Sequence, residues 1–424
     1  LLETILEKIP APAINRDDPF QLLVLALAQD SYKGKMGIGK IQSGSIARRQ
    51  NVVTLTKDGG QVQGKISDLA VFSGLERSDV ESAEAGEIVA ISGLEEVNIG
   101  DTIADPGSPV ALPRVTIDEP TVQMTFSVNN SPFAGRDGKY LTSRHLRERL
   151  FKELETNVSL RVQETDSADR FLVAGRGELH LGVLIEQMRR EGYELQISQP
   201  EVILHRDGDT VTEPFEELTI QVPSEYQGPV IEEIGKRRGE LRHMKLVHSE
   251  GTASEMHIEY HIPTRGIIGL KNILLAKTRG TIILHHVFSG YAPADEKALL
   301  VAPHGSLVAF EAGTSTAYAL FMTQERGELF IGATVEVYQG MVVGQNSRDE
   351  DLDVNVCKQK QLSNMRAAGT DEALVLTPPR EMSLEFAMEY IGQDELVEVT
   401  PKYLRLRKRL LNPDDRRKAK KSAK

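Results

Sequence analysis

Hydrophobic and polar residues alternate with a period of two in several stretches of the chain. The clearest are residues 217–222 and 255–262. Because successive side chains of a strand point to opposite faces of a sheet, this alternation predicts strands with one buried face. Apolar residues at helical spacing lie in 226–234 and 266–276. Residues 213–289 therefore predict strand, helix, two strands, helix and strand, the order of a ferredoxin-like sandwich.

Residues 117–200 predict the same order from different residues. Their first helix should bury Leu146 and Leu150, and their second should direct Leu181 and Met188 inward. The middle of the chain is therefore expected to hold two αβ sandwiches in tandem, which are similar in pattern and not in residue identity.

Short apolar stretches punctuated by glycine fill residues 19–116. Turn signals recur at 57–60 and 98–101, a rhythm that predicts a small β-barrel. Before the barrel, residues 1–12 predict a helix that stops at prolines, which cannot continue it. Residues 293–424 mix helical and strand patterns around a long polar stretch.

Length and composition agree with several soluble domains. A chain of 424 residues with 40% hydrophobic residues is too long for one core and too apolar to be disordered by default. No apolar run is long enough to cross a bilayer. The single cysteine, Cys357, excludes a disulfide framework within the chain and suits the reducing cytoplasm, where we expect the protein.

Charge is distributed unevenly. The net charge is −12, yet the tail 402–424 holds eleven basic and two acidic residues, a net of +9 that leaves −21 on the rest. Such asymmetry favours a basic end that binds polyanions, although a tail that only aids solubility remains an equal alternative.

Three segments resemble catalytic or metal motifs and fail on detail. Gly34–Lys40 has the spacing of a phosphate-binding loop, but Ile41 replaces the required serine or threonine and a strand follows, so a hairpin is the better interpretation. His257, Glu259 and His261 would share one strand face, which polar residues on a wet face explain better than zinc does. The alternating acids near residue 351 lack the glycine of a calcium loop. We predict no catalytic residue, no metal and no cofactor in this chain.

The polar segment 344–373 is predicted to be a long loop with cations set among amide side chains. Arginine and lysine suit phosphates, and amides suit base edges and ribose hydroxyls. With few large apolar residues, this loop has little to fold around, so we expect it to order on binding RNA. An ordinary disordered insertion is the alternative.

Several segments resemble a known series of domains. Residues 85–94 and 99–103 are similar to the second domain of translational GTPases, and 119–122 with 175–181 to the third domain of elongation factor G. Pro263–Gly269 resembles a segment of the fifth domain of that factor. Four further segments resemble the C-terminal domain particular to the TypA/BipA family: 338–341, 362–367, 369–373 and 394–401.

The resemblance implies a parent protein that binds and hydrolyses GTP with Mg²⁺ on the bacterial ribosome. It implies roles in large-subunit assembly and in stress or cold adaptation. The GTPase domain is expected to be missing from this chain. The predicted partners are the ribosome, large-subunit rRNA and the acceptor end of A-site tRNA, bound by a monomer without a membrane.

The predicted fold class is multidomain β and α+β. The expected parts are the last helix of the GTPase domain with a linker (1–18), a translation-factor β-barrel (19–116), two ferredoxin-like domains (117–200 and 201–292) and a C-terminal α+β domain (293–424) with a flexible loop (344–373) and a basic tail (402–424). The predicted RNA-binding residues are Arg348, Lys358, Lys360, Arg366, Lys402, Arg405, Arg407, Lys408 and Arg409.

Three alternatives stay open. The chain could be an enzyme in its own right, which measurable GTP hydrolysis by this chain alone would favour. The chain could be a fragment of an elongation-factor-type translocase, although residues 200–213 leave too little room for the fourth domain that such a factor carries between its two sandwiches. It could also be a protein-only scaffold without RNA binding, whose attachment to ribosomes would be independent of salt.

Overall fold

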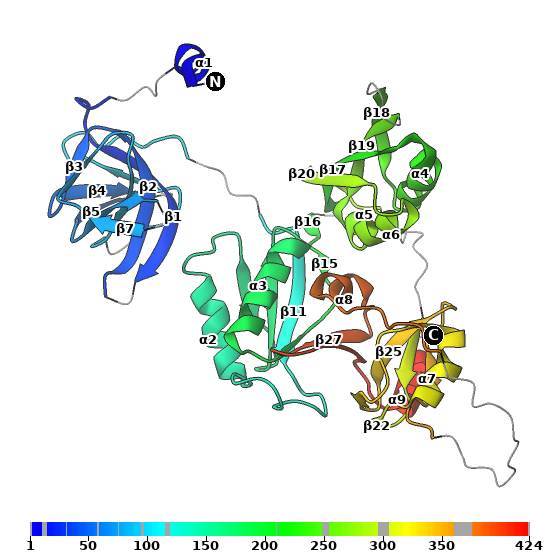
Figure 1. Cartoon of the computed structure of the whole chain (residues 1–424). Helices are drawn as coiled ribbons and strands as arrows, with labels where there is room; N and C mark the ends of the chain where they lie inside the picture. The colour runs from blue at the N-terminus through cyan, green and yellow to red at the C-terminus, as the bar shows by residue number, and fades with distance from the viewer. Residues whose placement is uncertain are drawn as a thin grey trace, which may run out of the picture. The chain divides into compact units, whose positions relative to one another are not determined.

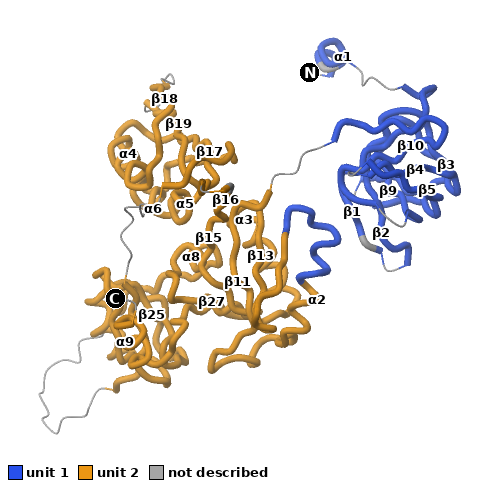
Figure 2. The backbone as a smooth tube through the Cα atoms, turned by 180° about the vertical axis from the view of Figure 1, so that it is seen from behind, with its two compact units in different colours: residues 1–118, 150–160 blue, residues 119–149, 161–424 orange. Residues whose placement is uncertain are grey.

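The computed structural model describes most of the chain: residues 2–10, 15–30, 32–56, 59–74, 76–94, 97–114, 119–208, 210–247, 254–295, 305–359 and 375–422. The chain forms two compact units, residues 1–118 with 150–160 and residues 119–149 with 161–424 (Figure 2). Across the described ranges, no helix is long and apolar enough to cross a membrane.

The first unit is built around an eight-stranded antiparallel sheet in the order β5-β4-β10-β1-β2-β9-β6-β7, with β3 paired to β8 (Figure 1). Its elements are α1 (Leu2–Lys8), β1 (Gln21–Asp30), β2 (Gly34–Ser43), β3 (Ser45–Ala47), β4 (Asn51–Leu55), β5 (Gln61–Lys65), β6 (Leu69–Ser73), β7 (Glu76–Asp79), β8 (Ser82–Glu84), β9 (Ile88–Ile91) and β10 (Thr102–Ala104). One core of fully buried side chains, among them Leu22, Ile41 and Val89, fills the sheet's inner face. The predicted β-barrel domain is confirmed.

The segment with phosphate-loop spacing lies within β2, which pairs antiparallel with β1. A Cβ atom placed on Gly39 would lie 2.1 Å from the carbonyl oxygen of Leu23 in β1. The hairpin interpretation is therefore confirmed, and Gly39 is explained by the close approach of two backbones.

Replacing Gly39 by alanine should lower the stability of this unit by about 1–3 kcal/mol, because the two strands must move apart. Thermal unfolding followed by circular dichroism checks this expectation. Gly177→Ala is the matched control, because no atom lies within 4 Å of a Cβ placed there. Equal melting temperatures for the two variants would contradict the steric explanation.

The second unit begins with the first predicted sandwich. Its elements are β11 (Val122–Val128), α2 (Ser143–Glu153), β12 (Arg161–Glu164), β13 (Arg170–Gly175), α3 (Glu178–Glu191), β14 (Leu195–Ile197) and the short β15 (Glu201–Val202). Strand order β12-β13-β11-β14 is that of a ferredoxin-like sheet. The inward-facing leucines of α2 and α3 are buried as predicted, with Leu150 and Leu181 fully so.

The second sandwich has the same order. Its elements are β16 (His205–Asp207), β17 (Thr210–Pro223), η1 (Ser224–Tyr226), α4 (Gln227–Lys236), β18 (Glu240–Val247), β19 (Glu255–Pro263), α5 (Thr264–Ile267), α6 (Leu270–Lys277) and β20 (Ile283–Pro293). β18 pairs with β19, β19 with β17, and β17 with β20. Leu218, Ile220 and Ile258 are fully buried under α4 and α6, so the alternation predicted the covered face correctly. Both ferredoxin-like domains are confirmed.

The C-terminal part is a mixed α+β fold, as predicted. Its elements are β21 (Ser306–Ala309), β22 (Gly313–Thr314), α7 (Ala317–Thr323), η2 (Gln324–Arg326), β23 (Gly327–Leu329), β24 (Glu336–Val337), β25 (Met341–Asn346), β26 (Leu352–Val354), α8 (Leu384–Tyr390), β27 (Glu395–Val399), β28 (Leu404–Lys408) and α9 (Pro413–Ser422). β14 pairs with β27, so the first sandwich and this part share one eleven-stranded sheet.

Two features differ from the sequence-based expectations. The start of the predicted loop 344–373 belongs to β25, and residues 352–354 form β26, whose Leu352 and Val354 pack on the core. The predicted flexible tail begins with strand β28 and continues as helix α9. Residues 360–373 of the predicted loop lie outside the described residues. The predicted domain boundaries stay predictions.

Candidate nucleic-acid interface

Strands β27 and β28 carry a buried network of charges. Glu398 is fully buried and accepts hydrogen bonds from the Tyr338 hydroxyl (2.9 Å), from Asn129 Nδ2 (3.1 Å) and from Arg405 Nη1 (3.0 Å). Burial, followed by the charge of Glu398, raises the pKa of Tyr338 well above its ordinary value. Tyr338 is therefore a neutral donor that helps to compensate the buried carboxylate.

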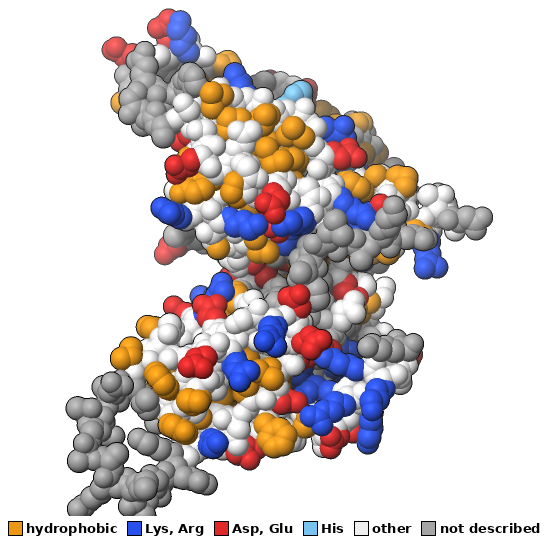
Figure 3. Space-filling model, turned by 90° about the vertical axis from the view of Figure 1, so that its right-hand side faces the viewer, with side chains coloured by type: hydrophobic (Ala, Val, Ile, Leu, Met, Phe, Trp, Pro, Cys, Tyr) orange, Lys and Arg blue, Asp and Glu red, His pale blue; other side chains and the backbone are white. Residues whose placement is uncertain are grey.

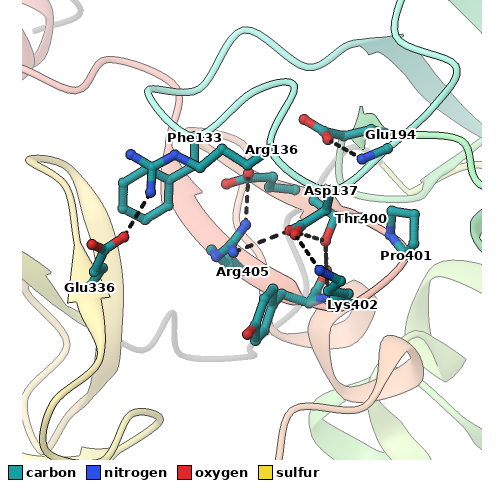
Figure 4. Close-up of polar contacts among 12 residues, drawn as sticks. Phe133, Arg136, Asp137, Glu194, Glu336, Thr400, Pro401, Lys402 and Arg405 are labelled. Atoms are coloured by element: carbon teal, nitrogen blue, oxygen red, sulfur yellow. Dashed lines mark hydrogen bonds and ion pairs between the residues drawn. The ribbon is translucent and has the colours of Figure 1, made fainter.

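Arg405, one of the predicted RNA-binding residues, lies between two carboxylates. One is Glu398. The other is Asp137, which belongs to the loop between β11 and α2 and whose Oδ2 atom lies 3.6 Å from Arg405 Nη2 (Figure 4). Its guanidinium carbon lies 5.2 Å from the ring centre of Phe133 and 4.6 Å from that of Tyr403. Arg405 thus joins the first sandwich to the C-terminal part, and little of its charge is left for a polyanion.

Lys408 is also committed to internal contacts. Its Nζ atom lies 2.9 Å from Asp351, 3.1 Å from Asp394 and 2.9 Å from Glu395, and its side chain is only 3% exposed. Burial alone would lower the pKa of Lys408, but the surrounding carboxylates outweigh it and raise the pKa above its ordinary value. This ammonium is charged and fully paired.

Arg407 is buried next to Lys408. One guanidinium nitrogen donates to Gln196 Oε1 at 2.5 Å and also to the side chain of Asn130. Desolvation lowers the pKa of Arg407, and the charge of the nearby Glu398 carboxylate opposes that effect. The placement of Arg407 and Lys408 therefore removes both from the surface that a phosphate could reach.

The other predicted residues are at the surface. Arg348, Lys358 and Arg409 are exposed, and none of them forms an ion pair with another side chain that the structure describes. Lys402 is 68% exposed and lies 3.7 Å from Asp137 (Figure 4). Lys360 and Arg366 lie outside the described residues.

Helix α9 adds a second set of cations. Arg416 is held against the body by Asp353 and by the carbonyl oxygens of Leu410 and Leu411. That anchor leaves the remaining basic side chains in solvent: Arg417, Lys418, Lys420 and Lys421. Figure 3 shows lysine and arginine side chains interspersed with acidic side chains over the lower part of the view.

Sequence reasoning missed the loop between β11 and α2, which anchors Arg405 and Arg407. Its Asn129 side chain bridges Glu194 (2.8 Å) and Glu398, while Gly135 N donates to Glu194 at 2.9 Å. The loop has no periodic pattern, and its partners come from segments far along the chain. No local signal in the sequence could have identified this anchor.

The histidines of β19 share one strand face, as predicted. His261 Nδ1 lies 3.0 Å from Glu217, and its ring stacks on Phe215 at 4.7 Å between centroids. Among the described residues, no group of three or more potential ligands could hold a metal ion. The interpretation as polar residues on a wet face accounts for these contacts.

A cluster of ionisable groups lies where α3, α8 and the second sandwich meet. Burial, and then the charge of Glu389, raise the pKa of Glu178 to about 7. A hydrogen bond donated by His286 Nδ1 to the Glu216 carboxylate raises the pKa of His286 against the opposing effect of burial. Both groups favour their protonated forms in the folded state.

The stability of this junction should fall as pH rises. A carboxyl whose folded pKa is raised stabilises the fold fully below its unfolded pKa, about 4.5, and that contribution is lost as pH rises through about 7. Between pH 5 and pH 8, Glu178 should cost the wild type about 2–3 kcal/mol of unfolding free energy, less than a fully buried carboxyl would cost. Glu178→Gln should remove this loss. Denaturant unfolding at both pH values measures it, and parallel profiles for wild type and variant would contradict the assignment.

Comparisons with known proteins agree with this architecture. Residues 19–106 match the family model for elongation factor G domain 2, residues 210–300 that for the elongation factor G C-terminus, and residues 304–413 that for the TypA/BipA C-terminal domain. The large ribosomal subunit assembly factor BipA of Synechocystis is 47% identical over 96% of this chain and 68% of its own length.

The chain belongs to the TypA/BipA family. Its relatives with the same name in Salmonella typhimurium and Haemophilus influenzae are 46% and 48% identical over 99% of the chain, which covers 68% and 67% of their lengths. The TypA/BipA C-terminal model covers β21 to β28, the strands that carry or support most of the predicted RNA-binding residues. This match favours the TypA/BipA interpretation over an elongation-factor-type translocase.

Proposed function

We propose that this TypA/BipA chain is the ribosome-binding portion of a large-subunit assembly factor and that it contacts ribosomal RNA through its C-terminal part. The names of its relatives support the assembly role. The observation that carries the RNA contact is the set of exposed cations on α9 together with Arg348, Lys358, Lys402 and Arg409. Lysine and arginine at a surface neutralise phosphates and release their counterions.

The geometry supports a revised list of contact residues. The surface cations of α9 replace Arg405, Arg407 and Lys408, which hold the sheet together. The roles of Lys360 and Arg366, and contact with the acceptor end of A-site tRNA, stay predictions that rest on the family resemblance. Action as a monomer, location in the cytoplasm and a role in stress or cold adaptation also stay predictions.

We also infer that GTP hydrolysis, with GTP and Mg²⁺, belongs to a separate GTPase domain of the longer protein. The resemblance to translational GTPases supports this inference, and the chain covers about two thirds of its relatives' length. The elements described here would then position that enzyme on the ribosome by shape and charge.

The test replaces the four exposed cations of α9 by alanine, R417A/K418A/K420A/K421A. Binding of purified large subunits, measured by cosedimentation across a salt series, should weaken most at low salt. The slope of log affinity against log salt should lose about 0.7–0.9 per removed phosphate contact.

The matched control removes four exposed cations elsewhere: Lys65, Arg144, Lys152 and Arg190. It should bind large subunits with nearly unchanged affinity and slope. If both variants lost equal affinity for large subunits, the net positive charge of the chain would determine binding and α9 would not be a defined contact site. Binding of the wild type that is independent of salt would instead support the protein-only scaffold.

A further inference from the structure

Strand β18 (Glu240–Val247) lies at one end of the sheet of the second sandwich. It pairs with β19 on one side, and no described strand pairs with its other side. All eight of its residues are exposed. An edge strand with unpaired N–H and C=O groups can accept an added strand, and proteins normally protect such edges.

The face of β18 that points toward the helices is hydrophobic and uncovered. Leu241, Met244 and Leu246 stand in register with the buried residues Tyr260, Ile258 and Met256 of β19. Their neighbours on β19 are covered by helices, whereas these three side chains are 46–50% exposed. The core face of the sheet therefore continues past its helical cover.

Helix α4 forms the second wall beside this strip. Gln227 Nε2 lies 3.3 Å from Met244 Sδ, so the start of the helix contacts the middle of β18. Ile231, one turn further along the same side, is 37% exposed, while Glu233 on the opposite side pairs with Lys277 of α6. Figure 3 shows hydrophobic side chains gathered on the face of this upper domain turned to the viewer.

The same side of α4 also has open space above its backbone. Gly228 and Gly235 lie next to Gln227 and Ile231 on the surface of this helix. No atom lies within 4 Å of a Cβ built on either glycine. Glycine weakens a helix, and nothing packed inside this domain explains either residue. Close approach of another backbone would explain both.

We propose that β18 and α4 form a docking groove for an extended segment of another protein, whose side chains are alternately hydrophobic and acidic and which adds a strand to the sheet. Hydrophobic side chains of that segment would cover Ile231, Leu241, Met244 and Leu246. Its acidic side chains would lie on the open face, beside the exposed His243 and Lys245 of β18. This surface is separate from the cations proposed to contact RNA.

The test uses the full chain and a fluorescein-labelled, acetylated peptide that alternates valine with glutamate. Anisotropy should give a dissociation constant on the order of micromolar, as for other strand-addition complexes. A peptide with lysine in place of glutamate should bind at least about tenfold more weakly. A peptide N-methylated along one edge keeps its side chains but loses the backbone hydrogen bonds, and it should not bind.

The variant I231Q/M244Q should weaken the valine–glutamate peptide about tenfold, because it makes the groove polar without adding charge. Val287→Gln is the matched control, since Val287 is 69% exposed on β20 of the same sheet, and its affinity should equal that of wild type. Hydrogen exchange should show new protection of β18 amides when the peptide binds.

Four results would overturn the proposal. The first is that the valine–glutamate peptide does not bind wild type, and the second is that I231Q/M244Q binds it equally well. The third is that the chain forms a dimer that this variant abolishes. The fourth is that oligouridylate displaces the peptide and that the variant binds oligouridylate as weakly as it binds the peptide. The third would assign the groove to a second copy, and the fourth to RNA. Because the peptide assay contains no ribosomes, it is independent of the α9 experiment.

Discussion

Replacing Glu398 by leucine should lower the free energy of unfolding by about 3–5 kcal/mol, the range for breaking a buried charged network by removing one partner. The substitution leaves Arg405, Asn129 and the Tyr338 hydroxyl facing an apolar side chain in a fully buried position. Urea unfolding followed by circular dichroism measures the loss.

The matched control for this variant is Glu336→Leu. Glu336 pairs with Arg136 at 2.7 Å, but both side chains are more than half exposed (Figure 4). An ion pair in solvent contributes about 0–1 kcal/mol. If the two variants lost equal stability, the burial of Glu398 would not be what makes its network important.

The second large effect is expected at Lys408. Replacing Lys408 by methionine keeps the length of the side chain and removes the buried ammonium that lies between Glu395, which is 4% exposed, Asp351 and Asp394. We expect a loss of about 3–5 kcal/mol from these uncompensated carboxylates, measured by denaturant unfolding at pH 7.

Lys420→Met tests whether burial decides the size of this effect. Lys420 approaches the same Asp351, at 3.3 Å, with a side chain that is 65% exposed. Its replacement should change stability by less than about 1 kcal/mol. A further variant, K408M/E395Q, should recover part of the loss, and no recovery would contradict the electrostatic explanation.

The sequence predicted those parts of the fold that repeat a local pattern. Leu218, Ile220 and Ile258 lie on the buried face that their period-two spacing requires, and Leu181 and Met188 lie on the buried side of α3. Both sandwiches could be assigned because each strand and helix has a core-facing side. The barrel hairpin at Gly39 followed from the same local reasoning.

The charged site could not be predicted in the same way. Arg405, Arg407 and Lys408 read as part of a basic tail, because their side-chain partners come from other segments: residues 130, 137, 196, 351 and 394–398. Pairing between β14 and β27 helps to bring these segments together. The two strands lie about 200 residues apart in the sequence, and local periodicity does not predict a pairing over that separation. Among the predicted RNA-binding residues that the structure describes, only Arg348, Lys358, Lys402 and Arg409 have the exposure that the sequence-based hypothesis requires.

The pairing of β14 with β27 also constrains the order in which the chain can fold during its own synthesis. Leu195 lies opposite Val399, so β14 emerges about 200 residues before its partner exists. At about 5–20 residues per second, that delay lasts roughly 10–40 seconds. Throughout it, the nascent first sandwich presents the apolar edge Leu195–Ile197, which is fully buried in the finished protein. Chaperones that recognise unpaired strands have a defined interval in which to bind this chain.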